Sequence, residues 1–389
     1  MYHSPTSLRP ALPPSAYSDP TWAEKEARNV LRPAWHPVAT TDQLAATGDF
    51  ITTTLLGVPV VVRRFGQTEN DVVAMRNVCA HRQCLIVSKS AGNAEKLRCG
   101  YHGWEYGADG LTRRIPQAKN FPHFDREAHR LDRFAVERCG GLWFVRLASD
   151  GPSLEDWLGN HAAWVAERTV RPRWMKTLQT TLPAEANWKI PIEGSLESYH
   201  LAAVHAATFG ADADPGEEHS EHTLWPGGTS FETTHRIPSL MTRAEDSALR
   251  LLGVATPDGR YEHHHLFPNL MLAGLHSMTL VTSVQPTGPQ SSELRMWQWG
   301  PQPTGASLLD RTIGRLVARS MGRVAAKSSV AVLQEDLAMF PQMQHGLNAP
   351  GATGLLGRCE ERLHAFQTFV ADAVPTRPTD EPAAKRAVE

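Results

Sequence analysis

The fold is decided by two stretches, Asn77-Val78-Cys79-Ala80-His81-Arg82 and Cys99-Gly100-Tyr101-His102-Gly103-Trp104. Each stretch holds one cysteine and one histidine, and 17 residues separate His81 from Cys99. The residues around them form short β-like runs divided by turn signals, which places each pair at the tip of a β-hairpin. Two rigid tips that each offer a thiolate and an imidazole predict one compact inorganic centre between them.

Two kinds of centre can use these four ligands. A structural zinc would take all of them in one tetrahedral set. A 2Fe–2S cluster of the Rieske type would take the thiolates of Cys79 and Cys99 on one iron and the imidazoles of His81 and His102 on the other. Zinc modules usually pair like ligands, whereas each pair here mixes Cys with His, and the flanking residues resemble the Rieske signature. The sequence therefore favours the cluster over zinc.

Composition excludes several other classes of protein. The 39 basic and 41 acidic residues leave a net charge of −2, which gives no electrostatic case for nucleic acid or an anionic membrane. The longest apolar runs fall short of the ~20 residues that a membrane helix needs, and the Pro-rich start shows no signal peptide. Five cysteines, an odd number, do not form a disulfide framework. We therefore expect a cytoplasmic protein without a membrane or nucleic-acid partner.

The length of 389 residues predicts more than one domain, at ~150 residues per domain. Short strands dominate the part around the Cys/His pairs, whereas strands and helices mix after a turn near 149–152. The expected units are an N-terminal arm with the start of the first helix (1–30), the Rieske 2Fe–2S domain (31–148), a second, catalytic domain (149–371) and a disordered tail (372–389).

Local patterns predict individual elements within these units. A hairpin is expected at Phe50–Phe65, and three neighbouring histidines, His263 to His265, fit the start of a partly buried strand. Hydrophobic spacing and caps predict the remaining elements. These are a helix from Pro20 capped by Thr21, helices at 154–167 and 307–343, and a polar loop at 211–222.

A second group of polar residues follows about a hundred residues later and includes Glu197, His200 and His205. If Glu197 and His200 lie on one helix, they are neighbours on one face, because three residues separate them. His200 and His205 differ by five residues, which at ~100° per residue splays them by roughly 140°. The two histidines can therefore hold one metal ion only if the helix ends or bends between them.

This segment resembles the mononuclear-iron motif of Rieske non-heme iron oxygenase large subunits, N-W-K, then E-N-x-x-E-x-Y-H and a second histidine. The matching residues are Asn187-Trp188-Lys189, Glu193 to His200, and His205. The order of the motifs agrees too, and the resemblance covers most of residues 35–345. Gly194 replaces the usual Asn, so no role of that Asn is carried over. The resemblance implies an α+β protein with an N-terminal all-β Rieske domain. It also implies a C-terminal α+β catalytic domain with an antiparallel sheet and helices holding a mononuclear iron.

The resemblance also implies roles for individual residues. His200, His205 and Asp336 would bind Fe(II) as two imidazoles and one carboxylate, which leaves positions open for O2 and substrate. Glu335 points about 100° away from Asp336 on a helix and is expected to be solvated. In the family, the acid at Glu197 links a Rieske histidine of one subunit, by position His102 rather than His81, to the iron histidine of its neighbour.

The implied function is that of a terminal oxygenase. Electrons from NAD(P)H would arrive through a separate reductase or ferredoxin, because the chain has no nicotinamide-binding or plant-type ferredoxin motif. With O2, a homotrimer would hydroxylate, dealkylate or dihydroxylate a small organic substrate. The alternative is a Rieske-type electron carrier or a zinc-stabilised binding protein, in which the later His/Asp set is structural.

The substrate class stays open between quaternary amines and aromatic compounds. Glu, rather than Asp, at position 197 looks closest to the homotrimeric members that act on glycine betaine and carnitine. A cation–π wall for such an amine could come from four aromatic residues. These are Tyr261, Phe267, Trp297 and Trp299.

Overall fold

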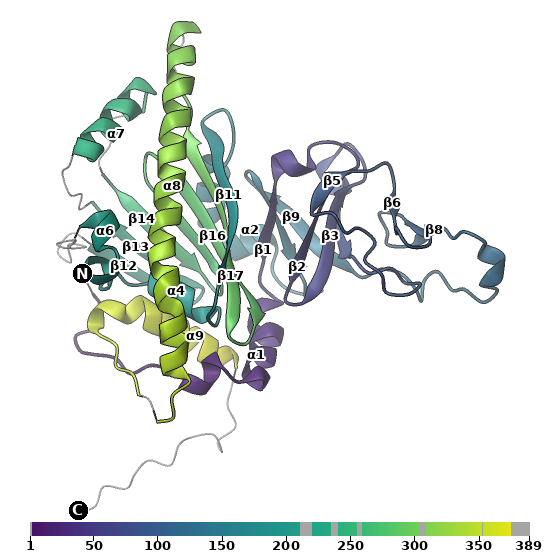
Figure 1. Ribbon diagram of the computed structural model, residues 1–389, viewed down its shortest axis with the longest axis horizontal. Coiled ribbons are helices and arrows are strands. Elements are labelled where there is room, and N and C mark those ends of the chain that lie inside the picture. Colours follow the sequence, from purple (N-terminus) through teal and green to yellow (C-terminus); the bar gives the residue numbers. More distant parts are fainter. Residues whose placement is uncertain are drawn as a thin grey trace, which may run out of the picture.

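The computed structural model describes residues 2–210, 220–234, 240–254, 259–303, 308–351 and 353–374. The protein is α+β, with a β-rich half at one end and a larger half of sheet and helices at the other (Figure 1). None of the helices in the described ranges has the length and hydrophobicity of a membrane span. The tail expected at 372–389 lies outside the described residues, apart from Asp372, Ala373 and Val374.

The β-rich half holds one antiparallel seven-stranded sheet and a small three-stranded sheet. Strands β2 (Asp49–Leu55) and β3 (Val58–Arg64) form a hairpin that turns at Leu56 and Gly57. The φ angles of these two residues, 50° and 77°, are positive, as a tight two-residue hairpin turn requires. The large sheet has the order β1 (His36–Thr40), β10 (Leu142–Arg146), β9 (Arg133–Cys139), β4 (Val72–Arg76), β3 (Val58–Arg64), β2 (Asp49–Leu55) and β5 (Ala91–Asn93). The small sheet has β6 (Leu97–Arg98), β7 (Glu105–Tyr106) and β8 (Thr112–Arg114).

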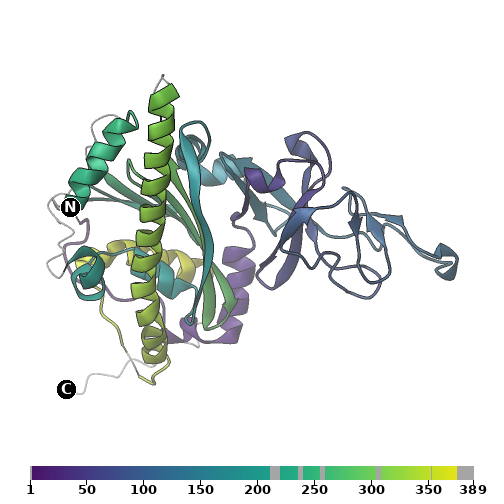
Figure 2. The same ribbon diagram turned by 45° about the horizontal axis from the view of Figure 1, so that its top comes forward.

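The second half is built on another antiparallel sheet of seven strands. Helix α8 (Leu308–Leu347) crosses one face of this sheet in both views (Figures 1 and 2). It approaches closely at Gly322, where a Cβ atom would lie 2.4 Å from the Thr177 side chain. The strand order is β11 (Trp174–Ala184), β17 (Ser291–Pro301), β16 (Thr279–Gly288), β15 (Leu270–Gly274), β14 (Tyr261–Leu266), β13 (Gly228–Thr233) and β12 (Ser220–Trp225).

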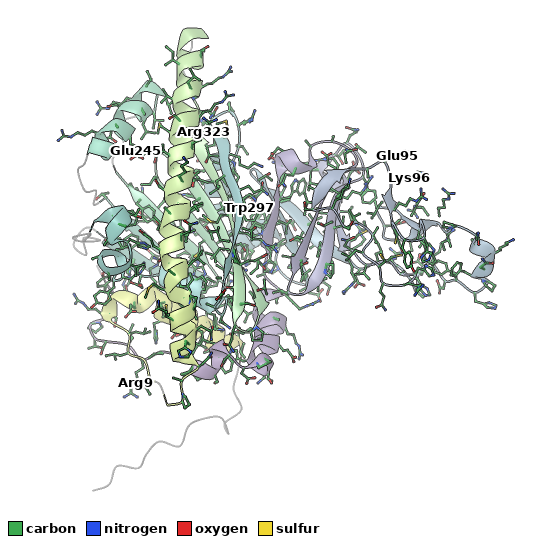
Figure 3. The ribbon with its side chains drawn as sticks, in the orientation of Figure 1. Arg9, Glu95, Lys96, Glu245, Trp297 and Arg323 are labelled. Atoms are coloured by element: carbon green, nitrogen blue, oxygen red, sulfur yellow. The ribbon has the colours of Figure 1, made fainter. Side chains whose placement is uncertain are left out.

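The opposite face of this sheet packs against the β-rich half. Trp297 and Trp299 point to this side, into a core that also contains Trp35 and Phe144. Figure 3 shows Trp297 between α8 and the strands of the β-rich half. Helices α2 (Leu154–Leu158) and α3 (His161–Arg168) complete this layer. The sheet is therefore covered on both faces, by α8 on one and by the β-rich half on the other.

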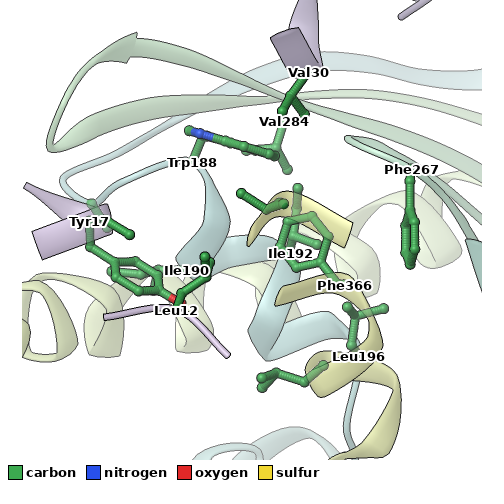
Figure 4. Close-up of a cluster of buried hydrophobic side chains, with 14 of the residues drawn as sticks. Leu12, Tyr17, Val30, Trp188, Ile190, Ile192, Leu196, Phe267, Val284 and Phe366 are labelled. Atoms are coloured by element: carbon green, nitrogen blue, oxygen red, sulfur yellow. The ribbon is translucent and has the colours of Figure 1, made fainter. Parts of the chain in front are cut away.

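The N-terminal arm packs onto the second half. Its residues Leu12, Tyr17 and Val30 join the core around helix α4 (Lys189–Ser195), as Figure 4 shows. Helix α1 (Pro20–Glu26) begins as expected, but Asp19 rather than Thr21 caps it, because the Asp19 carboxylate accepts the Thr21 N–H. The remaining helices are α5 (Leu201–Val204), α6 (Ala206–Phe209), α7 (Leu240–Leu251) and α9 (Glu361–Ala373).

Two local expectations were wrong. The helix expected at 154–167 is divided into α2 and α3, because Gly159 adopts a φ of 52° between them. The loop expected at 211–222 ends in strand: its last three residues belong to β12, and residues 211–219 lie outside the described ranges. His222 is buried there and shares a hydrogen bond with Glu361 of α9, so tertiary packing orders a segment that is polar in sequence.

Candidate functional site

The two Cys/His pairs meet at the outer end of the β-rich half. Cys79 and Cys99 are buried, and the rings of His81 and His102 have centroids 4.6 Å apart. Each pair sits in a tight loop closed by backbone hydrogen bonds, from Cys79 N–H to the Cys84 carbonyl and from Cys99 N–H to the Trp104 carbonyl. The structure therefore brings together all four residues that the sequence singled out.

These four side chains suit a 2Fe–2S cluster. The Nδ1 atom of His81 is buried and has no hydrogen-bond partner among the described residues, as expected of a ring nitrogen that serves as a metal ligand. The Tyr106 hydroxyl lies 3.1 Å from Cys79 Sγ and accepts the N–H of Ala80, which leaves its own proton for the sulfur. Such hydrogen bonds to ligand sulfurs tune the potential of a cluster.

Cys99→Ser is expected to bleach the red-brown colour of the anaerobically purified protein, because one cluster iron loses a thiolate. Visible absorption and iron analysis measure the loss. Cys139→Ser is the matched control, because Cys139 is a partly buried thiol in a different core, where it donates to the Ala162 carbonyl, and the colour of this variant should persist. A colourless wild-type protein with one zinc per chain would contradict the cluster.

A second group of ligands meets between helices α5, α6 and α8. His200 precedes the single turn of α5 and His205 follows it, and the helix ends at His205, whose φ of −101° and ψ of 25° are not helical. Their Nε2 atoms lie 3.2 Å apart, and Asp336 Oδ1 of α8 lies 3.2 Å from His205 Nε2 and 3.6 Å from His200 Nε2. Within the described ranges, this is the one group of three or more His, Cys, Asp or Glu whose ligand atoms all lie within 4.8 Å of one another, the spacing that a single metal ion needs.

Two further acids hold the outer nitrogens of these histidines. Glu197 Oε1 lies 2.5 Å from His200 Nδ1, and Glu335 Oε2 lies 2.7 Å from His205 Nδ1. Glu335 is thus not the solvated acid that helix geometry suggested, because α6 packs beside α8 and brings His205 within its reach. Glu197 and His200 do not share a helix either: both lie in the turn between α4 and α5, where Glu197 also accepts the His200 N–H.

The electrostatics of this group suit a divalent cation. With both Nδ1 atoms donating to carboxylates, two Nε2 lone pairs and the Asp336 carboxylate face the same small space. Burial raises the pKa of Asp336 to about 6, and Glu197 and Glu335 oppose its ionisation further. Although burial favours a neutral ring, Glu197 raises the pKa of His200. A bound cation would relieve the repulsion that Glu197 and Glu335 exert on the Asp336 carboxylate, and each Nε2 atom can offer it a lone pair, so the donor set fits Fe(II).

Comparisons with known proteins identify the family of the chain. The family model of the ring hydroxylating alpha subunit, catalytic domain, matches residues 157–376, more than half of the chain. The model of the Rieske [2Fe-2S] domain matches residues 34–125. The chain belongs to the Rieske oxygenase alpha-subunit family.

Relatives within this family differ in chemistry. A glycine betaine monooxygenase oxygenase subunit from Chromohalobacter salexigens is 31% identical over 195 residues, which cover 50% of this chain and 43% of that protein. The match thus spans less than half of that relative. An anthranilate 1,2-dioxygenase large subunit from Burkholderia cepacia is 26% identical over 321 residues, 75% of either protein.

Solved structures share the fold. A quaternary ammonium Rieske monooxygenase in complex with L-carnitine has a TM-score of 0.72 at 20% identity and covers 93% of this chain and 94% of that one. A naphthalene 1,2-dioxygenase mutant bound to phenanthrene has a TM-score of 0.69 at 20% identity, with coverage of 95% and 92%. The arrangement of a Rieske domain and a catalytic sheet is thus common to both branches.

A buried ion pair anchors the helix that leads into the proposed iron site. Lys189, at the start of α4, is fully buried, and its Nζ lies 2.7 Å from Glu26 of α1 and 2.9 Å from the Ala16 carbonyl. Glu26 also accepts the indole N–H groups of Trp22 and Trp188. The N-W-K motif thus fixes α4 to the N-terminal arm, a contact that sequence reasoning missed because the partner lies 163 positions away.

Lys189→Met is expected to lower the free energy of unfolding by about 3–5 kcal/mol, because Glu26 would remain buried without its cation. Urea unfolding followed by tryptophan fluorescence measures the change. Lys96→Met removes a lysine whose side chain is 54% exposed and leaves its partner Glu105 paired with Arg114, so it should cost about 1 kcal/mol or less. Equal losses of unfolding free energy in the two variants would contradict the prediction that the buried Lys189–Glu26 pair stabilises the fold.

The aromatic wall expected from the sequence does not form. Trp297 and Trp299 belong to the core facing the Rieske domain, whereas Phe267 belongs to the core around α4, on the other face of the sheet. Alternate residues of a strand point to opposite faces, and the strand register decides which face meets the helices. At Gly194, an added Cβ would lie 3.4 Å from the Phe340 ring.

Proposed function

We propose that this protein is a Rieske terminal oxygenase in which Cys79, Cys99, His81 and His102 hold a 2Fe–2S cluster. In the catalytic domain, His200, His205 and Asp336 hold a mononuclear Fe(II). The observation that carries the proposal is the convergence of these three ligand atoms within 4.8 Å of one another, in a different domain from the Cys/His pairs. An electron carrier or a zinc-stabilised protein needs only the pairs.

The bound iron and the residues of the chain have different roles in this proposal. The bound Fe(II) supplies O2 activation, and the protein orients the ligands and excludes water. Glu197 and Glu335 hold the outer ring nitrogens and so direct Nε2 of each histidine inward. His205 is 1% exposed, which keeps bulk water from that side of the site. The two domains are proposed to span residues 31–148 and 149–371, with the arm 1–30 packed on the second.

Electrons must cross between chains in this proposal. Cys99 directly follows β6, whereas Asp336 lies on α8, and Figure 1 shows β6 and α8 in the two separate halves of the molecule. Tyr101 beside His102 is 57% exposed, and Tyr199 beside Glu197 is 80% exposed, so both ends offer apolar side chains for a contact. A head-to-tail homotrimer would place His102 of one chain near Glu197 of the next.

The electron donor is proposed to be a separate reductase or ferredoxin that draws on NAD(P)H. The described cysteines are all free, as the cytoplasm favours, and we place the reaction there. The substrate is proposed to be a small quaternary amine, which Glu197 and the glycine betaine and carnitine relatives support. An aromatic acid is the second candidate, because the anthranilate enzyme matches a larger share of the chain.

Iron analysis and O2 uptake test this proposal. Anaerobically reconstituted protein should hold about three irons per chain, two in the cluster and one in the catalytic domain. Glycine betaine, carnitine, choline, anthranilate and terephthalate should each be assayed for substrate-dependent O2 uptake with a reductase. A chain with two irons and no uptake in the presence of any substrate would be an electron carrier instead.

A further inference from the structure

Helix α8 offers two adjacent acids to the proposed iron site, although one carboxylate ligand is enough. Asp336 faces the inner Nε2 atoms, whereas Glu335 reaches round the ring of His205 to its outer Nδ1, at 2.7 Å. The second oxygen of Glu335 accepts a hydrogen bond from the hydroxyl of Thr208 in α6, at 2.9 Å. Both carboxylate oxygens of Glu335 are therefore used inside this chain.

His205 needs such a support. It ends α5, a helix of only four residues, and a single turn does not hold its own conformation firmly. A neutral imidazole carries one proton, which can sit on either nitrogen. An acceptor at Nδ1 draws the proton there, so the lone pair of Nε2 points toward His200 and Asp336.

We propose that Glu335 is a positioning residue for His205, which it holds in the tautomer and direction that metal binding needs, while tying α6 to α8. The inference rests on the proposed iron site. Glu335 differs from Glu197 in its expected effect. Glu197 is proposed to serve electron transfer between subunits, whereas Glu335 has both oxygens bound to its own chain and should affect the affinity for the metal.

Anaerobic titration of iron-depleted protein with Fe²⁺ tests this role. Glu335→Leu removes both acceptor oxygens and is expected to weaken Fe²⁺ binding 10–100-fold. Glu335→Gln keeps one acceptor oxygen for Nδ1 and should recover most of the affinity, a rescue that simple packing does not explain. Gln334→Leu is the matched control, because it makes a similar change at the exposed neighbouring position of α8, and it should bind Fe²⁺ like the wild type.

Two further measurements separate positioning from folding. The cluster spectrum should stay at its wild-type form in all three variants, and the melting temperature should stay at its wild-type value in Glu335→Gln and Gln334→Leu. Thr208→Val removes only the hydrogen bond from the Thr208 hydroxyl to Glu335, so it should weaken Fe²⁺ binding less than Glu335→Leu does. If Glu335→Leu does not fold, Glu335→Ala takes its place, because it also removes both acceptor oxygens, and wild-type Fe²⁺ affinity in that variant overturns the proposal.

The outcome also separates this inference from the proposed function. If Glu335→Leu binds Fe²⁺ as tightly as Gln334→Leu while His205→Ala loses the metal, the role of Glu335 is wrong and the site stands. If His205→Ala also binds Fe²⁺ like the wild type, the site itself is wrong.

Discussion

His200→Ala, His205→Ala and Asp336→Ala are each expected to remove about one iron per chain and to abolish substrate turnover. Two imidazoles and one carboxylate are the whole protein contribution to such a site, so the loss of any one leaves it incomplete. The cluster spectrum should remain, because the Cys/His pairs lie in the other domain. Iron analysis, visible absorption and O2 uptake measure the three properties on the same sample.

His129→Ala is the control for these variants. Its ring is exposed, packs against Phe124 and shares a hydrogen bond with the backbone carbonyl of Asp125, so both metal sites and turnover should be unchanged. Full oxygenase activity in any one of the ligand variants would remove that residue from the proposed site. Loss of the cluster together with the iron would instead indicate misfolding, and the Lys189→Met variant provides the reference for a destabilised chain.

Glu197→Gln is expected to keep both metals and still let the reductase reduce the cluster, while transfer from cluster to iron collapses. The Glu197 carboxylate lies 2.5 Å from His200 Nδ1. In the trimer it would also meet His102 of the next chain, and a neutral amide cannot accept N–H bonds from two imidazoles with the same charge-assisted strength. Single-turnover product formation after reduction of the cluster measures the transfer.

Glu360→Gln is the matched control for this prediction. Burial raises the pKa of Glu360 and the nearby Glu197 raises it further, but the Glu360 carboxylate accepts its hydrogen bond from the backbone N–H of Gly357. This variant should transfer electrons normally. An unchanged single-turnover rate in Glu197→Gln, or an active monomer, would contradict the bridge between subunits.

Structural features that are formed by residues close together in the sequence could be predicted from the sequence. The Cys/His pairs occupy tight loops whose hydrogen bonds close within five or six residues, as from Cys79 to Cys84 and from Cys99 to Trp104. The hairpin at Leu56-Gly57 follows from turn geometry. His200 and His205 could be assigned only with the help of the family resemblance, because their spacing alone argues against one regular helix.

Contacts between distant segments were decided by the packing of the chain. Glu335 bonds His205 because α6 lies against α8, across 130 positions of sequence, and the helical angle alone suggested solvent. Trp297 and Trp299 face the Rieske domain because the register of β17 turns them away from α8. Hydrophobic periodicity shows that a side chain is buried but not which neighbour buries it, since only the docking of whole elements sets that choice. The local motifs therefore specify the metal ligands, whereas the packing of α8 places Glu335 where it holds the ligand His205.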